Sequence, residues 1–137
     1  MERTLAIVKP DAVASGNIGN VLARLEQEGF RILAVRKLQL SEQQAQAFYA
    51  VHSERPFFGE LVEFMTSGPV VPVALERENA VAGLREVLGA TDSRKAAAGT
   101  LRNLYGTDVQ YNAVHGSDSI DNAKQEIAFF FPRCELP

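Results

Sequence analysis

The stretch from Asn112 to Ser119 holds the first candidate for chemistry in this chain. It contains His115, one of 2 histidines. Imidazole is the one side chain that is largely unprotonated, and therefore nucleophilic, near neutral pH without special activation. Gly116 follows it, and the Ser and Asp residues after that glycine suit a helix start. A histidine in such a Gly/Ser loop is also typical of a solvated position, so the rest of the chain must decide between these interpretations.

The segment after His115 predicts a helix from Ser117 to Phe129, with Ser or Asp as the N-cap. Its apolar residues Ile120, Ala123 and Ile127 fall on one face. Glu126 would then lie in the last turns of this helix.

The first 40 residues of the chain predict a strand, a helix and a second strand. Leu5 to Val8 is a short apolar run typical of a strand that is buried on both faces, and it ends at Lys9, at a place where sites are often built. Ile18 to Leu25 has helical periodicity and is closed by a glycine, and Phe30 to Leu40 alternates apolar and basic residues like a half-solvated antiparallel strand.

The rest of the chain predicts further helices and strands. One helix begins at Ser41 and runs through Tyr49, and another follows Pro56 and ends near Met65. A strand from Val70 to Leu75, a helix from Asn79 to Leu88 and a last short strand that begins at Val114 complete the order.

The connection from Gly89 to Tyr111 has no clear periodicity. Connections this long are usually functional or disordered. We interpret it as functional because basic and hydroxyl side chains gather in it, namely Thr91, Arg94, Lys95, Thr100 and Arg102.

The order of these elements predicts an α+β fold. We expect a ferredoxin-like α/β sandwich, with a four-stranded antiparallel sheet covered by helices. At 137 residues and 46% hydrophobic residues, the chain suits a single domain over residues 1–137.

Composition limits the partners and the location. The net charge of −3 and the pI near 5.4 disfavour a broad basic surface for nucleic acid. The single cysteine, Cys134, excludes an internal disulfide and Cys-rich zinc motifs, which agrees with a reducing compartment. No apolar stretch approaches the roughly 20 residues of a membrane span, and the N-terminus has no signal-peptide pattern, so we expect no membrane association and a cytoplasmic protein.

Six short motifs occur in order along the chain. They are Lys9-Pro10-Asp11, Arg55 to Phe58, Met65 to Val70, Leu88 to Thr91, Gly99 to Arg102 and Asn112 to Ser119. Because it carries these motifs in this order, the chain resembles the nucleoside diphosphate kinases over nearly its whole length. A single motif could arise by chance, whereas six spaced motifs make the resemblance specific.

The resemblance implies a phosphotransferase that works in two steps. His115 takes the γ-phosphoryl group from a nucleoside triphosphate such as ATP on its Nδ1 (pros) atom, and then hands it to a nucleoside diphosphate. Cations and hydrogen-bond donors must surround the migrating group, because its negative charge spreads over the equatorial oxygens. Such an enzyme maintains ribo- and deoxyribonucleoside triphosphate pools with little base specificity.

Roles for residues around the phosphates follow from the resemblance. Lys9, Arg85, Thr91 and Arg102 match phosphate contacts, and arginine suits a bidentate grip on phosphate oxygens. Asn112 matches the residue that holds the sugar hydroxyl together with Lys9.

The resemblance also implies roles beside the histidine and at the base. Tyr49 matches the tyrosine next to the catalytic histidine, and Glu126 and Ser117 match the pair that positions the imidazole. The base site would be Phe57, which stacks on the base, with Leu61 and Val109 nearby. Stacking without hydrogen bonds to base edges accepts any base.

Family members use Mg²⁺ that is bound mostly to the nucleotide phosphates, in keeping with the preference of this ion for phosphate and water ligands. Asp118 matches a residue that contacts the ion through water. An acidic residue near a helix N-terminus is the alternative interpretation of Asp118. His52 has no role that the resemblance assigns.

Family members also assemble as homo-oligomers, from dimers that pair into tetramers or triple into hexamers. The sequence does not choose between these assemblies. The segment after Phe131 is short, as in compact bacterial members.

The chain departs from the family pattern at three places. Asp92-Ser93 replaces a usual Asn-Pro, which predicts a less constrained loop. Asn103-Leu104-Tyr105 follows Arg102 where an Asp and then Phe or Tyr are common, which puts loop packing and subunit contacts in doubt. Arg77 stands where glycine is frequent, and the sequence offers no reason for it.

Three functions remain to be compared. The first is a broad-specificity nucleoside diphosphate kinase, and the second is a nucleotide-binding or regulatory module that kept the pocket. An inactive homologue would lack the histidine or a phosphate-binding arginine, and this chain lacks neither. The third, nucleic-acid binding, is disfavoured by the acidic balance.

Overall fold

The computed structural model describes residues 1–137. The strands are β1 Glu2–Val8, β2 Arg31–Val35, β3 Val71–Arg77 and β4 Val114–Gly116. The α-helices are α1 Pro10–Ala14, α2 Ile18–Gln27, α3 Glu42–Phe48, α4 Phe58–Met65, α5 Ala80–Leu88, α6 Leu101–Tyr105 and α7 Ile120–Phe130. Three short 3-10 helices are η1 Ala50–His52, η2 Ser93–Lys95 and η3 Arg133–Glu135. Among the helices, none combines the length and the apolar character needed to cross a bilayer.

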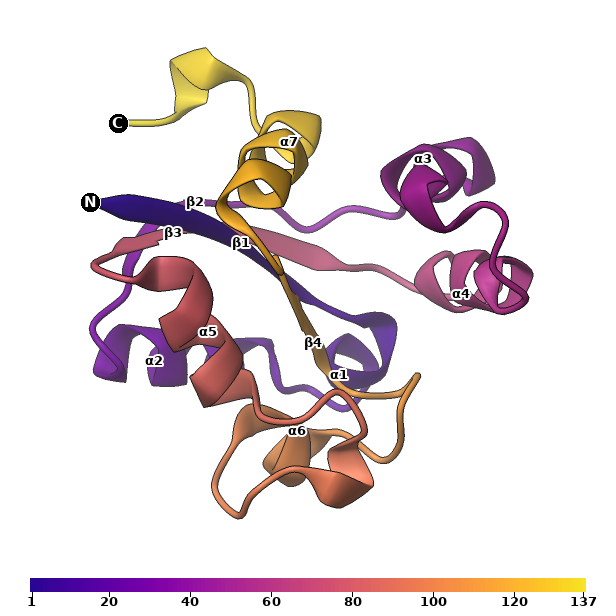
Figure 1. The fold of residues 1–137 in the computed structure, drawn as a ribbon, viewed down its shortest axis with the longest axis horizontal. Helices are drawn as coiled ribbons and strands as arrows, with labels where there is room; N and C mark the ends of the chain where they lie inside the picture. The colour runs from indigo at the N-terminus through magenta and orange to yellow at the C-terminus, as the bar shows by residue number, and fades with distance from the viewer.

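The four strands form one antiparallel sheet in the order β2-β3-β1-β4. Helices α2 and α5 lie on one side of the sheet and α7 lies on the other, with α3 and α4 beyond one end of it (Figure 1). This arrangement confirms the predicted α+β, ferredoxin-like fold.

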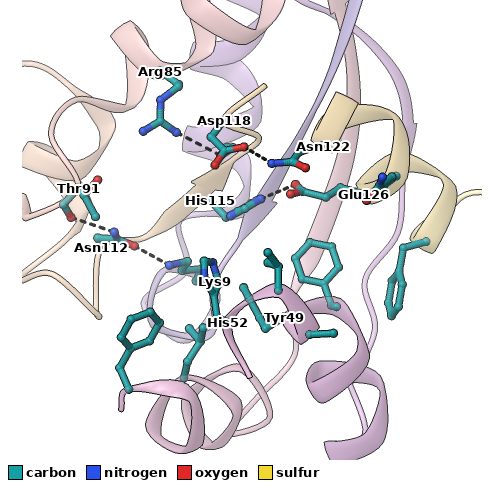
Figure 2. A pocket seen from close by; sticks show the side chains of 18 of the residues that line it. Lys9, Tyr49, His52, Arg85, Thr91, Asn112, His115, Asp118, Asn122 and Glu126 are labelled. Carbon is teal, nitrogen blue, oxygen red and sulfur yellow. Dashed lines mark hydrogen bonds and ion pairs between the residues drawn. The ribbon is translucent and has the colours of Figure 1, made fainter. Parts of the chain in front are cut away.

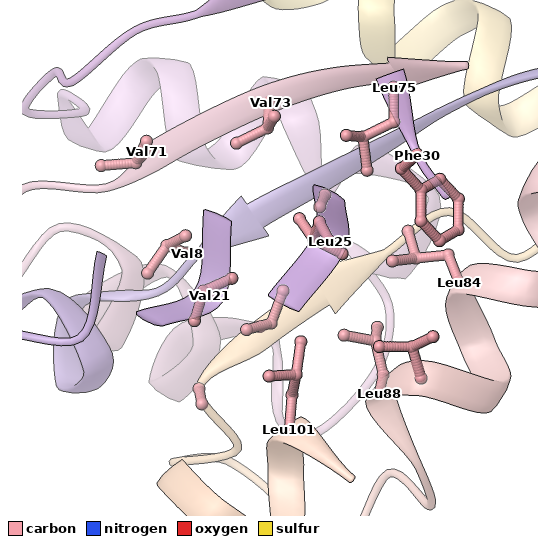
Figure 3. Packing of buried hydrophobic residues seen from close by; sticks show 14 of the residues in the cluster. Val8, Val21, Leu25, Phe30, Val71, Val73, Leu75, Leu84, Leu88 and Leu101 are labelled. Atoms are coloured by element: carbon pink, nitrogen blue, oxygen red, sulfur yellow. The ribbon is translucent and has the colours of Figure 1, made fainter. Parts of the chain in front are cut away.

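Strand β1 divides the core into two halves. Ala6 and Val8 join a cluster with residues of α2, α5 and α6, whereas Leu5 and Ile7 join a second cluster with residues of α3, α4 and α7. Alternate side chains of a strand point to opposite faces, so a continuous apolar run indicates burial on both faces. Figure 3 shows the first cluster, in which Leu84 and Leu88 of α5 and Leu101 of α6 pack near the sheet.

The second strand is shorter than the sequence predicts. The sequence indicates a strand from Phe30 to Leu40, but β2 ends at Val35. A register shift lies between Ile32 and Ala34, and only Leu38 pairs again, in an isolated bridge. Val35 and Leu38 share one register, in which Arg36 lies opposite Pro72. The Arg36 N–H donates to the Pro72 carbonyl, but proline has no N–H to donate in return, which accounts for the early end of the ladder.

Two short helices were not predicted. Helix α1 begins at Pro10, a residue favoured in the first helical turn, but it is too short for an apolar pattern. Helix α6 lies inside the 89–111 connection, where the side chain of Thr100 accepts a hydrogen bond from the Asn103 N–H and caps the helix.

The last helix begins at Ile120, and its N-cap is Ser119, whose hydroxyl accepts from the Asn122 N–H. The predicted start at Ser117 was therefore wrong by three residues, and neither Ser117 nor Asp118 is the cap. Ile120 is 51% exposed rather than packed with the buried Ala123 and Ile127.

The structure supplies a reason for Arg77. Its guanidinium lies over the Phe30 ring, 4.4 Å from the ring centroid, and Nη1 donates to the Glu28 carbonyl at 2.8 Å. A Cβ atom on Gly83 would lie 1.6 Å from Arg77 Nη2, so the absence of a side chain at Gly83 makes room for the arginine.

Candidate active site

One cavity of about 580 Å³ collects nearly all the predicted site residues (Figure 2). Those that line it are Lys9, Tyr49, Phe57, Leu61, Arg85, Thr91, Arg102, Val109, Asn112, His115, Asp118 and Glu126. Ser117 lies behind Glu126 and is fully buried. Residues more than a hundred positions apart in the sequence therefore meet in one place.

Strand β4 delivers His115 to this cavity. It pairs with β1, and His115 stands opposite Ile7. Gly116 follows it, against helix α5, where an added Cβ atom would lie 2.8 Å from Leu88 Cδ1 and 3.1 Å from Leu84 Cδ2. The glycine thus lets β4 approach the helix closely.

A chain of hydrogen bonds orients the imidazole of His115. Its Nε2 lies 2.7 Å from Oε1 of Glu126, and the Ser117 hydroxyl donates to the same oxygen at 2.9 Å. Ser117 is itself tied to β1, because its Oγ accepts from the Leu5 N–H at 3.3 Å. An ionised carboxylate can only accept, so this contact favours the neutral tautomer that has its proton on Nε2 and a lone pair on Nδ1.

Lys9 lies where β1 ends and α1 begins, and it is 7% exposed. Its Nζ donates to Asn112 Oδ1 at 2.8 Å, and the Asn112 amide donates to the Thr91 carbonyl at 2.9 Å. Burial, with a contribution from the nearby Arg102, lowers the pKa of the Lys9 ammonium to about 8. The group therefore changes its charge close to neutral pH.

Two arginines add positive charge to the same cavity. Arg102 is 5% exposed, and its guanidinium donates to the Val114 carbonyl at 3.0 and 3.2 Å and to the Gly89 carbonyl at 3.1 Å. Burial, and then the charge of Arg85, lower the pKa of Arg102 to about 10. Neither arginine nor Lys9 forms a salt bridge with a carboxylate in this structure. Three cations without anionic partners make the cavity suited to a polyanion.

Part of the cavity lining is apolar. Phe57, which is 46% exposed, lines the cavity together with Leu61 and Val109. The ring of His52 lies 5.6 Å from that of Phe57, between ring centroids. An exposed aromatic ring at a cavity mouth can stack on a flat heterocycle.

Tyr49 is buried beside the histidine. Its hydroxyl has no hydrogen-bond partner in the structure, and burial together with the charge of Glu126 raises the pKa of the phenol. The hydroxyl therefore stays protonated and able to donate to an anion in the cavity.

The cavity offers one carboxylate that suits a cation held by a ligand. Asp118 lines it, and Asp118 Oδ1 accepts from the Asn122 side chain. No group of three or more His, Cys, Asp or Glu side chains is placed to hold a metal ion. The residues present therefore fit Mg²⁺ that is carried by phosphates and water, with Asp118 as a carboxylate able to face it.

Sequence reasoning missed several residues that line the cavity. They are Ala47, Phe48, Ala50, Val51, His52, Gly116, Asn122, Gln125 and Phe129. One signal was available for Asn122, because it precedes Glu126 by four positions on a predicted helix and so shares its face. No comparable signal marked His52, which ends η1.

Comparison with known proteins decides the family. The family model described as "Nucleoside diphosphate kinase" matches residues 2–136. The chain belongs to the nucleoside diphosphate kinase family. The match confirms the family that the sequence motifs predicted.

Two curated relatives carry the same name. The nucleoside diphosphate kinase of Campylobacter lari (strain RM2100) is 58% identical over 136 residues, which cover 99% of each chain. That of Anaeromyxobacter dehalogenans (strain 2CP-1) is 56% identical and covers 99% of this chain and 92% of its own.

Two solved structures of the family match the fold closely. The Aquifex aeolicus nucleoside diphosphate kinase superposes with a TM-score of 0.97 at 50% identity, covering 99% of both chains. The Halobacterium salinarum nucleoside diphosphate kinase, solved in complex with CDP, gives 0.94 at 43% identity and covers 99% of this chain and 91% of the other.

Where Asp92-Ser93 replaces the usual Asn-Pro of the family, other hydrogen bonds hold the loop. The backbone N–H of Ser93 donates to the Asp108 carbonyl at 3.1 Å, a bond that proline could not make. The Asp92 carboxylate accepts from the backbone and the side chain of Arg94. These bonds constrain the loop that the sequence predicted to be less constrained.

Proposed function

We propose that this chain is a nucleoside diphosphate kinase in which His115 carries the phosphoryl group between two nucleotides. The observation that carries the proposal is the bond from His115 Nε2 to Glu126, which leaves Nδ1 free within a cavity lined by Lys9, Arg85 and Arg102. A nucleophile and unpaired cations in one cavity are what a ping-pong phosphoryl transfer requires.

The first step transfers the γ-phosphoryl group of a nucleoside triphosphate, ATP for example. Nδ1 of His115 bonds to the phosphorus while the bond from phosphorus to the bridging β–γ oxygen breaks, and the nucleoside diphosphate leaves with that electron pair. Glu126 holds the proton on Nε2 and stabilises the positive charge that the imidazole gains. The second step is the reverse, with another nucleoside diphosphate as acceptor.

The remaining site residues bind and orient the nucleotide in this proposal. Arg85, Arg102 and Thr91 contact the phosphates, and the Tyr49 hydroxyl can donate to the group in transfer. Lys9 and Asn112 are already joined by a 2.8 Å hydrogen bond, and this pair would hold the sugar hydroxyl.

The base rests on Phe57, between Leu61 and Val109. The exposed Phe57 ring favours stacking over hydrogen-bond readout of base edges and therefore little base specificity. The structure of the Halobacterium salinarum relative with CDP supports a pyrimidine diphosphate as one ligand.

Mg²⁺ enters the proposal as a partner of the phosphates, with Asp118 contacting it through water. When bound, the ion neutralises phosphate charge as the phosphoryl group moves. The protein contributes the surrounding donors, and no dedicated metal cage is needed.

Family membership also supports proposals about the whole protein. Residues 1–137 would form one catalytic domain, located in the cytoplasm, with free nucleotides rather than nucleic acid as its main partners. The protein would assemble as a homo-oligomer built from dimers, a tetramer or a hexamer. Strand β2 lies at an edge of the sheet, with Val35 43% exposed, and offers an open edge for such contacts.

Steady-state kinetics test the proposal. Purified protein with ATP and Mg²⁺ should convert GDP, CDP, UDP and TDP to the triphosphates, with parallel lines in double-reciprocal plots because the two nucleotides never bind together. Tight nucleotide binding without turnover would instead indicate a binding module. Binding of DNA in preference to mononucleotides, with a strong dependence on salt, would favour the nucleic-acid function.

A further inference from the structure

The turn that leads into β4 contains a strained residue. Ala113 has a backbone φ of 70°, and Asn79 is the only other non-glycine residue in this left-handed region. Residues other than glycine rarely adopt this conformation, because their Cβ atom comes too close to the following carbonyl oxygen. Ala113 is fully buried and lies between Asn112 and the strand that carries His115. Such strain persists only where the surroundings hold the residue in place.

Asp11 and its neighbour Lys9 hold both backbone polar groups of Ala113. The Ala113 N–H donates to Asp11 Oδ2 at 3.0 Å, and the Lys9 N–H donates to the Ala113 carbonyl at 2.8 Å. The other carboxylate oxygen of Asp11 is buried without a partner. Burying an acceptor without a hydrogen bond costs free energy. The buried position of this oxygen therefore does not stabilise the fold by itself and calls for another reason.

The groups on either side of Ala113 belong to the proposed site. On one side, Asn112 receives the hydrogen bond from Lys9 Nζ. On the other, Val114 and His115 pair with β1. A rotation of the backbone at Ala113 would therefore move Asn112 and His115 relative to each other.

We propose that Asp11 is a positioning residue of this site, whose carboxylate holds Ala113 in the left-handed conformation and so fixes Asn112 and His115 relative to Lys9. This inference rests on the proposed function for its kinetic readout only. Asp11 contacts neither the nucleotide nor the phosphoryl group. It acts through the backbone of Ala113 on the residues that do.

A double-variant cycle tests the inference. Glycine adopts the left-handed region without strain, so Ala113→Gly should make the carboxylate partly dispensable. We expect Asp11→Ala to lower kcat/KM for GDP by about 10- to 100-fold, as misplaced reacting groups do. The double variant Asp11→Ala with Ala113→Gly should recover part of this loss.

The sugar contact provides a readout that a purely structural role would not move. The analogue 2′,3′-dideoxy-GDP lacks the hydroxyls that Lys9 and Asn112 are proposed to hold. We expect Asp11→Ala to reduce the preference of the enzyme for GDP over this analogue. Equal losses on both substrates, without recovery by glycine, would mean that Asp11 only stabilises the first turn of α1 and would overturn the inference.

A control variant and a non-kinetic measurement complete the design. Glu42→Ala removes an acidic residue from the first turn of α3, outside the cavity, and should leave the preference between the two substrates unchanged. Amide hydrogen exchange at Ala113, measured by NMR on the full chain, should become faster in Asp11→Ala. Unchanged exchange would overturn the inference.

The measurement of exchange separates the two proposals. A wild-type protein that fails to phosphorylate GDP would refute the proposed function, whereas the exchange at Ala113 would still decide the role of Asp11. Asp11→Asn keeps the side-chain volume and one acceptor oxygen, so it should fold even where the alanine variant does not. We expect its exchange and kinetics to lie between those of the wild type and Asp11→Ala, because the amide oxygen can still accept from the Ala113 N–H. Kinetic losses as large as those of Asp11→Ala with wild-type exchange at Ala113 would overturn the inference.

Discussion

At the scale of single residues, hydrogen-bond geometry determines which imidazole nitrogen of His115 is free for the proposed attack. Glu126 binds Nε2 at 2.7 Å, and the Ser117 hydroxyl donates to the same carboxylate oxygen at 2.9 Å. The ring is thereby fixed with one nitrogen toward α7 and the other free. The cations of the cavity lie apart from this pair, so they can serve the phosphates.

Replacing Glu126 by glutamine tests this arrangement. The variant keeps the shape but removes the charge that stabilises the developing imidazolium. We expect kcat to fall about 10- to 100-fold, because hydrogen bonds to charged groups contribute about 1.5 to 3 kcal/mol. Lys124→Gln, on the same helix but outside this cavity, serves as the control. A kcat for Glu126→Gln equal to that of the wild type would contradict the role of Glu126.

The lowered pKa of Lys9 predicts a pH dependence. Because the pKa of Lys9 is about 8 in the fold and 10.5 ordinarily, its positive charge is lost as the pH rises through 8. In the free enzyme, kcat/KM should therefore fall above pH 8, since this parameter reports groups of the unliganded protein. The free energy of unfolding should rise between pH 8 and 10.5, because burial penalises only the charged form.

Variants assign this alkaline limb to its residue. Lys9→Arg keeps a charge throughout the range and should remove the inflection near pH 8, even if its maximal rate is lower. Lys95→Arg, an exposed lysine of the long connection, is the matched control and should leave the profile unchanged. An inflection that persists in Lys9→Arg would show that another group titrates there.

At the scale of elements, the site depends on how closely β4 approaches α5. Gly116 lies against Leu84 and Leu88, which are both fully buried. This contact sets the distance between the strand that carries His115 and the helix that carries Arg85. The glycine beside the histidine is thus a packing requirement.

Gly116→Ala should therefore destabilise the protein. A new methyl group in a packed core costs about 1 to 3 kcal/mol, measured as a fall in the free energy of unfolding in urea. Gly19→Ala is the matched control, because nothing lies within 4 Å of a Cβ atom there. In helix α2 that substitution should be neutral or stabilise by about 0.5 to 1 kcal/mol. Equal stability of Gly116→Ala and the wild type would contradict the packing argument.

Most elements could be predicted from the sequence because their patterns are local. The continuous apolar run of β1 and the helical spacing of α2 are properties of neighbouring residues. Helices α1 and α6 could not be predicted this way, because each is 5 residues long and shows no full apolar period. The early end of β2 also depends on Pro72 of β3 lying opposite Arg36, a pairing that only the tertiary structure determines.

The prediction of the site relied on the family motifs more than on local pattern. Lys9, Asn112 and His115 come from distant segments, and no periodicity indicates that they meet. The hydrogen bond from the Ser93 N–H to the Asp108 carbonyl could not be predicted either. The sequence shows that the usual proline is missing, but it does not show which hydrogen bond forms in its place.

At the scale of the whole molecule, the sheet order leaves β2 and β4 at its two edges. The site lies beside β4, so an assembly through β2 would leave it open. The tetramer or hexamer proposed from family membership predicts that light scattering on the purified protein gives a mass four or six times the 15.0 kDa of one chain. A mass of one chain at micromolar concentration would contradict the proposed assembly.

The central claim is that His115 is phosphorylated during turnover. Brief incubation of the protein with γ-labelled ATP and Mg²⁺, without an acceptor, tests it most directly, with His115→Ala in parallel. We predict a phosphoenzyme that is labile in acid, stable in base, absent from the variant and discharged by added GDP or CDP. Absence of label on the wild type, or equal labelling of His115→Ala, would contradict the assignment of His115 as the nucleophile.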